Sequence, residues 1–101
     1  MTINIVKESG HTLAVLDGRL DTPASLEVAP DFEALQEAAS GTVILDCEKL
    51  SYISSSGLRL FLSLRKSAIN KGGDVIVKHI SNDIRQVFMM TGFLNLFKIE
   101  D

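Results

Sequence analysis

The 101-residue sequence predicts an α/β fold: a single domain, residues 1–101, in which helices pack on a mixed β-sheet. Three observations lead to this fold class. The apolar patterns alternate in the order β-β-α-β-α-β-α-β, a two-residue turn joins the first two strands, and a helix precedes each later strand. A short turn produces an antiparallel pair, whereas helical crossovers produce parallel strands. The apolar content of 46% is sufficient for one hydrophobic core.

In chain order, the predicted strands cover residues 3–8, 12–16, 42–47 and 74–79 and a short edge strand within 93–99, and the predicted helices cover 22–39, 58–71 and 84–91. The first two strands are apolar runs joined by Ser9-Gly10, a dipeptide typical of a hairpin turn. The third strand is a β-branched apolar run without alternation, which is typical of a strand covered on both faces.

Each predicted helix begins with polar residues that can cap it. Thr22 is expected as the cap of the first helix and Pro23 as its first residue, while Pro30 predicts a kink or a break. The motif Ser-Ser-Ser-Gly precedes the second helix, and Ser81 precedes the third. Glycines follow both of these helices and are expected to end them.

Composition and charge exclude several classes of protein. The net charge is −3 and the ten Lys and Arg residues are scattered, which argues against nucleic-acid binding. No apolar run approaches the ~20 residues of a membrane span, so no membrane insertion is expected. The single cysteine, Cys47, cannot form an intramolecular disulfide, and the N-terminus lacks a signal-peptide pattern. We therefore expect a cytoplasmic protein.

The sequence contains no pattern of an enzyme or of a cofactor site. It has neither a G-x-S-x-G elbow nor a phosphate-binding glycine motif, so no catalytic residue and no cofactor are expected. His11, His79 and Cys47 do not occur at ligand spacing, and we expect no metal. Both histidines are interpreted as surface or structural residues, and Cys47 as a small apolar filler.

Polar residues follow two of the predicted strands, in the loops 17–22 and 46–57, which we expect at the same edge of the sheet. The second loop brings three serines to a helix N-terminus, where free N–H groups and the helix dipole favour an anion. From the residues alone, a capping role and a phosphate-accepting role both remain open for these serines. Met89 and Met90 allow two interpretations as well, because one of them either points outward to a partner or packs at the margin of the core.

The segment "VILDCEKLSYISSSGLRLFLSLRKSAINKGGDVIV" resembles the central motif of STAS domains, a family that includes the bacterial anti-sigma factor antagonists. The family pattern is an apolar strand that ends in Asp, followed by Asp/Ser-Ser-Ser/Ala-Gly-Leu and a helix. "LDGRLDTPAS" resembles the Gly-x-Leu-Asp loop of the family, and "VFMMTGFLNLFKI" resembles its third helix and last strand. The resemblance covers nearly the whole chain in the expected order.

The resemblance implies a partner-switching regulator rather than an enzyme. In phosphorylatable members, an anti-sigma factor that is also a serine kinase phosphorylates the serine before the glycine, here Ser56, with Ser55 as second choice. Phosphorylation releases the partner, and a serine phosphatase of the PP2C type reverses it. Ser54 and Ser55 are then the expected caps. The implied partner-binding residues are Asp21, Thr22, Ser54, Ser55, Gly57, Leu58, Arg59 and Met90.

One residue departs from the family pattern. Antagonists of sporulation and stress responses often have Asp two residues before the phosphorylated serine, where this sequence has Ser54. This difference supports an alternative, in which the protein is a non-phosphorylated STAS interaction subunit of a transporter or signalling complex.

Overall fold

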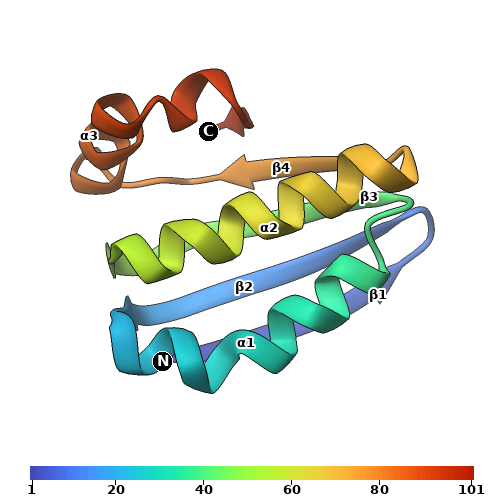
Figure 1. The fold of residues 1–101 in the computed structure, drawn as a ribbon, viewed down its shortest axis with the longest axis horizontal. Helices are drawn as coiled ribbons and strands as arrows, with labels where there is room; N and C mark the ends of the chain where they lie inside the picture. Colours follow the sequence, from blue (N-terminus) through green and yellow to red (C-terminus); the bar gives the residue numbers. More distant parts are fainter.

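The computed structural model describes all residues, 1–101, as a five-stranded β-sheet packed against helices (Figure 1). The elements are β1 (Thr2–Glu8), β2 (His11–Leu20), α1 (Thr22–Glu37), β3 (Thr42–Ile53), α2 (Ser55–Lys71), β4 (Asp74–Lys78), α3 (Asn82–Thr91), the 3-10 helix η1 (Phe93–Asn95) and β5 (Lys98–Glu100). The predicted order of strands and α-helices is confirmed.

The sheet is mixed, as predicted, with the strand order β1-β2-β3-β4-β5. The strands β1 and β2 are antiparallel, and every other neighbouring pair is parallel. Gly10 in the hairpin turn has a φ of 84°, in the left-handed region that glycine adopts without a steric penalty. Because β2, β3 and β4 are parallel, their carboxyl ends and the starts of the helices that follow lie at one end of the molecule.

The helices cover one face of the sheet, and Figure 1 shows α1 and α2 lying side by side across it. In β3, Val43, Leu45 and Cys47 point towards the helices and are buried, while Ile44 and Asp46 alternate with them and remain partly exposed. The prediction that this strand is covered on both faces is therefore wrong. The run lacks alternation for another reason: the helix-free face carries its own apolar row across β2, β3 and β4, in which Leu13, Ile44 and Ile76 are register neighbours.

Five phenylalanines form the centre of the core and hold α2 in place. Phe61 of α2 contacts Phe32 of α1 at a ring-centroid distance of 5.8 Å and Phe88 of α3 at 6.1 Å, the latter edge to face. Phe93 and Phe97 complete the cluster. A buried side chain of this size contributes roughly 1.5–3 kcal/mol relative to an exposed one, so the packing of three helices depends on these rings.

The strands β2 and β3 extend further than the sequence predicts. Loops were expected from Asp17 and Asp46 onwards, but β2 continues to Leu20 and β3 to Ile53. The two extensions pair with each other through two shifts in register, which accommodate polar residues within the strands. The polar residues of these extensions therefore belong to irregularly paired strand ends rather than to loops.

The cap predicted for α1 is wrong, and of the two outcomes predicted at Pro30, the break does not occur. The N-cap is Asp21 and not Thr22, because Asp21 Oδ1 accepts a hydrogen bond from the N–H of Ala24 at 2.9 Å. The helix also continues through Pro30 without a break. Pro30 leaves the carbonyl of Leu26 without its helical donor, but both residues lie on the exposed side of α1, where water can replace the lost bond.

Candidate functional site at the start of α2

The register of β2 and β3 brings the two predicted polar segments together, as expected. Leu20 and Ile53 are partners at the ends of the two strands, and the N–H of Ser54 donates to the carbonyl of Leu20 at 2.9 Å. Asp21 and Ser54 therefore follow directly from paired residues. The starts of α1 and α2 lie next to each other at the carboxyl edge of the sheet.

Ser54 is the N-cap of α2, so one of the two serines expected as caps has this role. Its Oγ accepts a hydrogen bond from the N–H of Gly57 at 3.2 Å, and its carbonyl accepts from the N–H of Leu58 at 2.9 Å. Ser54 is only 9% exposed. Ser55 and Ser56 are the first two helical residues, of which Ser55 is exposed and Ser56 half-buried. At these positions the backbone N–H groups have no acceptor within the helix.

Gly57 allows α2 to approach the sheet closely. A Cβ atom on this residue would lie 2.7 Å from Cγ of Leu20 and 2.9 Å from Cγ1 of Ile53, both of which are buried side chains. Contacts this short do not occur between real carbon atoms. Gly57 and Ser54 are buried, so they fix the position of the helix start rather than offer a surface of their own.

Asp21 and Thr22 form the neighbouring part of the site. Besides the cap bond to Ala24, the carbonyl of Asp21 accepts a hydrogen bond from Ser25 Oγ at 2.9 Å. Asp21 is half-buried and Thr22 is exposed. The capping role predicted for Thr22 thus belongs to Asp21. Its carboxylate lies at the start of α1, which is next to the start of α2.

The three helix starts differ in charge. Helix α1 has the carboxylate of Asp21 at its N-cap, and α3 has Asp83 in its first turn. Helix α2 has a serine cap and no acidic residue in its first turn. The positive end of the α2 dipole is therefore not compensated by a carboxylate of α2 itself. Arg59, exposed and one turn further along the helix, adds positive charge.

One pair of residues beside the site was not predicted from the sequence. The guanidinium of Arg19 lies 4.4 Å from the ring centroid of Tyr52, as a cation–π pair, and Tyr52 is 41% exposed. The two residues are register partners one position before Leu20 and Ile53. They were missed because β2 and β3 were expected to end earlier. Continuing the strands and applying the two-residue alternation would place both on the helix-free face.

Leu58 and Met90, both predicted to bind a partner, differ in exposure and in position. Leu58 is half-buried and packs against the core. Met90 lies near the end of α3, rather than on α2, and is 86% exposed, and Met89 is 63% exposed. The sequence left two interpretations open for these methionines, and the structure shows both of them pointing outward.

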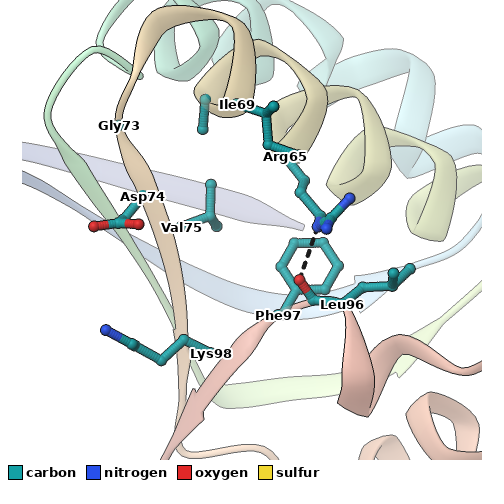
Figure 2. A pocket seen from close by; sticks show the side chains of 9 residues that line it. Arg65, Ile69, Gly73, Asp74, Val75, Leu96, Phe97 and Lys98 are labelled. Atoms are coloured by element: carbon teal, nitrogen blue, oxygen red, sulfur yellow. Dashed lines mark hydrogen bonds between the residues drawn. The ribbon is translucent and has the colours of Figure 1, made fainter.

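The two cavities of the protein lie at the opposite end of the sheet from the serines. One, of about 260 Å³, opens between the end of α2 and the starts of β4 and β5 (Figure 2). In it, Arg65 Nε donates a hydrogen bond to the carbonyl of Leu96 at 2.7 Å. The other, also of about 260 Å³, lies beside the β1–β2 turn and the start of β3. The start of α2 is thus a surface rather than a pocket, which suits a macromolecular partner better than a small molecule.

The remaining reactive side chains do not approach the serines. Cys47 is fully buried, and burial together with the charge of Asp46 raises the pKa of its thiol to about 12, so it remains protonated at neutral pH. His11 pairs with Glu8 and His79 with Asp46, each at 3.1 Å. None of the three acts on the hydroxyls at the start of α2 in this structure.

None of the helices combines the length and the apolar character needed to cross a lipid bilayer.

Comparison with known proteins assigns the family. The model of the STAS domain matches residues 2–101, and the chain belongs to this family. Among its relatives is BtrV of Bordetella bronchiseptica, which is assigned as an anti-sigma factor antagonist. The two sequences are 28% identical over 99 residues, which cover 98% of this chain and 85% of BtrV.

Solved structures show the same fold at low sequence identity. The anti-sigma factor antagonist SpoIIAA in its unphosphorylated form matches with a TM-score of 0.75 and 22% identity, over 99% of this chain and 88% of that chain. Phosphorylated SpoIIAA from Bacillus matches with a TM-score of 0.73 and 22% identity, over 97% and 90%. A sulfate transporter family protein from Wolinella succinogenes matches with a TM-score of 0.77 and 14% identity, over 95% and 80%. The predicted STAS fold, which anti-sigma factor antagonists share, is confirmed.

Proposed function

We propose that this STAS protein is a partner-switching anti-sigma factor antagonist and that Ser56 is its phosphate acceptor. The observation that supports this proposal most is the charge at the start of α2. This helix has no acidic residue at its N-cap or in its first turn, whereas α1 and α3 each have one. A phosphate on Ser56 would lie where the helix dipole favours an anion.

In the unphosphorylated state, the exposed residues around this helix start are the proposed docking surface for an anti-sigma factor that is also a serine kinase. Thr22, Ser55 and Arg59 are exposed there, and Leu58 is half-buried. The buried Ser54 and Gly57 support this surface from below. Met90 extends it only if the partner also reaches α3. Docking of this kind places Ser56 Oγ next to the kinase.

Phosphorylation adds about −1.5 to −2 charges and three acceptor oxygens. The N–H groups of Ser55 and Ser56 and the side chain of Arg59, three residues beyond Ser56, can compensate this charge without a change of fold. The docking surface becomes anionic and repels the partner. Solved SpoIIAA supports this local mechanism, because the chain matches its unphosphorylated and phosphorylated forms almost equally well, with TM-scores of 0.75 and 0.73.

The protein would be a substrate of its regulators and not an enzyme. No histidine or cysteine is positioned to activate Ser56, so the kinase would supply the catalytic groups for phosphorylation. A PP2C-type serine phosphatase would remove the phosphate and restore docking.

Ser54 supports a second candidate function, a STAS interaction subunit that is not phosphorylated. Related antagonists often have Asp at this position. Either residue can cap the helix, but Ser54 does so without the negative charge beside the acceptor. A kinase that requires this negative charge for recognition would not phosphorylate Ser56.

The deciding experiment incubates the protein with its cognate anti-sigma factor kinase and ATP and measures the phosphate bound by intact mass spectrometry. We expect one phosphate on the wild type and on Ser55→Ala, and none on Ser56→Ala. Ser55→Ala is the matched control, because the two serines are adjacent in the first turn and neither caps the helix. Equal incorporation into both variants would overturn the assignment of Ser56, and absence of phosphate from all three proteins would favour the non-phosphorylated interaction subunit.

A further inference from the structure

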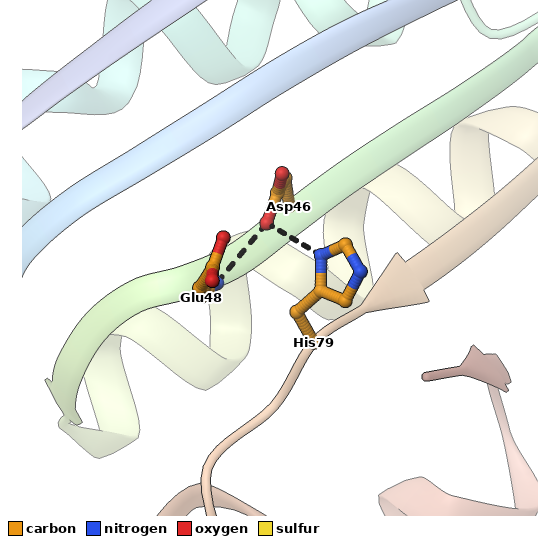
Figure 3. A group of neighbouring side chains, drawn as sticks. All are labelled: Asp46, Glu48 and His79. Atoms are coloured by element: carbon orange, nitrogen blue, oxygen red, sulfur yellow. Dashed lines mark hydrogen bonds and ion pairs between the residues drawn. The ribbon is translucent and has the colours of Figure 1, made fainter.

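The helix-free face of the sheet holds a second group of polar side chains, Asp46, Glu48 and His79 (Figure 3). We propose that these residues bind a first-row divalent cation of the Zn²⁺ type, with His79 and the two carboxylates as ligands. The site is separate from the start of α2, and the proposal does not depend on phosphorylation of Ser56.

The fold brings the three ligands together from β3 and from the residue that follows β4. Asp46 lies on the helix-free face of β3, partly exposed, and Glu48 follows at a shift in register, with its carboxylate within 4.8 Å of the other ligand atoms. His79 follows β4, whose last residue, Lys78, is the register partner of Asp46. A continued strand would turn His79 to the helix side. Instead, its φ of 60° turns the chain, and the imidazole lies against Asp46 as Figure 3 shows.

The distances suit a metal. The possible ligand atoms of the three residues all lie within 4.8 Å of one another, and His79 Nδ1 lies 3.1 Å from Asp46 Oδ1. Two ligands of one Zn²⁺ ion, each at roughly 2.0–2.2 Å, are about 3.0–3.5 Å apart. A cation can therefore replace the proton shared by His79 and Asp46 with little movement of either residue. Glu48 is exposed and free to adjust its rotamer.

Backbone groups orient the ligands in advance. The N–H of Glu48 donates to Asp46 Oδ1 at 3.1 Å, and the N–H of His79 donates to the carbonyl of Glu100 at 3.1 Å. Such bonds hold a ligand in place and reduce the conformational entropy lost on metal binding.

The charge of the group also fits a divalent cation. Lys78, opposite Asp46 in the sheet, pairs with Glu100 at 3.7 Å rather than with Asp46. Glu48 forms no ion pair, and the only ion-pair partner of Asp46 is His79. With a neutral imidazole, the three ligands carry two negative charges. One nitrogen and carboxylate oxygens form a ligand set suited to Zn²⁺ and its first-row neighbours.

Exposure of the side chains determines the kind of site. The side chains of His79 and Asp46 are 42% and 22% exposed, so water can occupy the remaining coordination positions. A bound ion would link β3 to the segment between β4 and α3 and would stabilise the folded state by mass action.

The chain contains its own control. His11 lies 3.1 Å from Glu8, the same distance as between His79 and Asp46, but it belongs to no cluster with a second carboxylate. A metal that needs three ligands should distinguish the two histidines, whereas nonspecific binding to any exposed histidine should not.

The test is a titration of the full chain with Zn²⁺, in buffer free of phosphate and chelators, followed by calorimetry and by the NMR signals of the two histidine rings. We expect one binding event that shifts the His79 ring signals and leaves those of His11 unchanged. The variants His79→Asn and Glu48→Gln should weaken binding at least ~10-fold, and His11→Asn should leave it unchanged. Asparagine is chosen at position 79 because it tolerates the left-handed backbone.

The proposal is overturned if Zn²⁺ produces no binding event, if both rings respond equally, or if His11→Asn weakens binding as much as His79→Asn. The wild-type NMR measurement needs no variant, so the test remains decisive even if a substitution prevents folding. Absence of metal binding would not affect the assignment of Ser56 as phosphate acceptor, because Ser56 lies on the helix-covered side of the sheet and the proposed ligands lie on the helix-free side.

Discussion

The starts of α2 and α3 have nearly the same local structure but different surroundings. Each helix has a serine N-cap whose Oγ accepts from the N–H three residues later at 3.2 Å, namely Gly57 for Ser54 and Ile84 for Ser81. Each ends at a glycine in the left-handed region. However, Ser54 is buried and its first turn lacks an acidic residue, whereas Ser81 is exposed and is followed by Asp83.

The comparison shows that a serine cap alone does not define a site. Helix α3 neutralises its own dipole with Asp83 and needs nothing further. Gly57 allows α2 to pack closely against β2 and β3. The free N–H groups at the start of α2 and the exposed Arg59 remain available to bind an anion that does not belong to the helix.

Gly57→Ala should give the largest loss of stability. The new methyl group would lie within 3 Å of two buried side chains, and overpacking of this kind costs about 1–3 kcal/mol, against about 1 kcal/mol that alanine gains over glycine in a helix. Because the clash involves two buried side chains, the overpacking cost should lie near the top of this range, and we expect a net decrease of about 2 kcal/mol in the free energy of unfolding, measured by urea denaturation. The control is Gly41→Ala, where the nearest atom lies at 3.5 Å, and the account is wrong if both variants behave alike.

Removing the two caps should have a smaller effect that differs between the helices. Ser54→Ala and Ser81→Ala each delete one cap, which costs about 0.5–2 kcal/mol. We expect a loss of about 1 kcal/mol for Ser54→Ala, because burial limits the access of water to the freed N–H of Gly57, and a smaller loss for Ser81→Ala. Urea denaturation of both variants provides the measurement, and a larger loss for Ser81→Ala would contradict the comparison.

A change of charge in the first turn should have the smallest effect on stability. Adding a carboxylate to α2 and removing one from α3 should change the stability in opposite directions. Ser56→Asp places a negative charge where α2 has none and should stabilise the protein by about 0.3–1 kcal/mol, while Asp83→Asn should destabilise it by a similar amount. Thermal unfolding at low and high salt is the measurement, since salt screens both effects. Destabilisation by Ser56→Asp would show that the start of α2 does not favour an anion.

Much of the fold could be predicted from local patterns. The turn at Gly10, the cap at Ser81 and the stops at Gly72 and Gly92 depend on residues close in sequence, and their predictions are confirmed. The true ends of β2 and β3 could not be predicted in this way. They depend on the pairing of two irregular strands, which stabilises polar segments that would otherwise form loops.

In the candidate site, too, local features could be predicted and contacts between distant residues could not. Ser54–Gly57 could be located because a helix start is a local feature. The pair of Arg19 and Tyr52 and the group of Asp46, Glu48 and His79 join residues far apart in sequence, so no spacing along the chain indicates them. The missing carboxylate at α2 is visible in the sequence, but its importance emerges only from comparison with the carboxylates that the structure places at the starts of α1 and α3.

In the proposed mechanism, one phosphate at the start of α2 releases the partner without a change of fold. The most direct test measures, by calorimetry, the affinity of the anti-sigma factor kinase for the unphosphorylated protein and for protein phosphorylated at Ser56. We predict at least a ~10-fold weaker affinity after phosphorylation, which corresponds to about 1.4 kcal/mol. Equal affinity of the two forms would contradict the account.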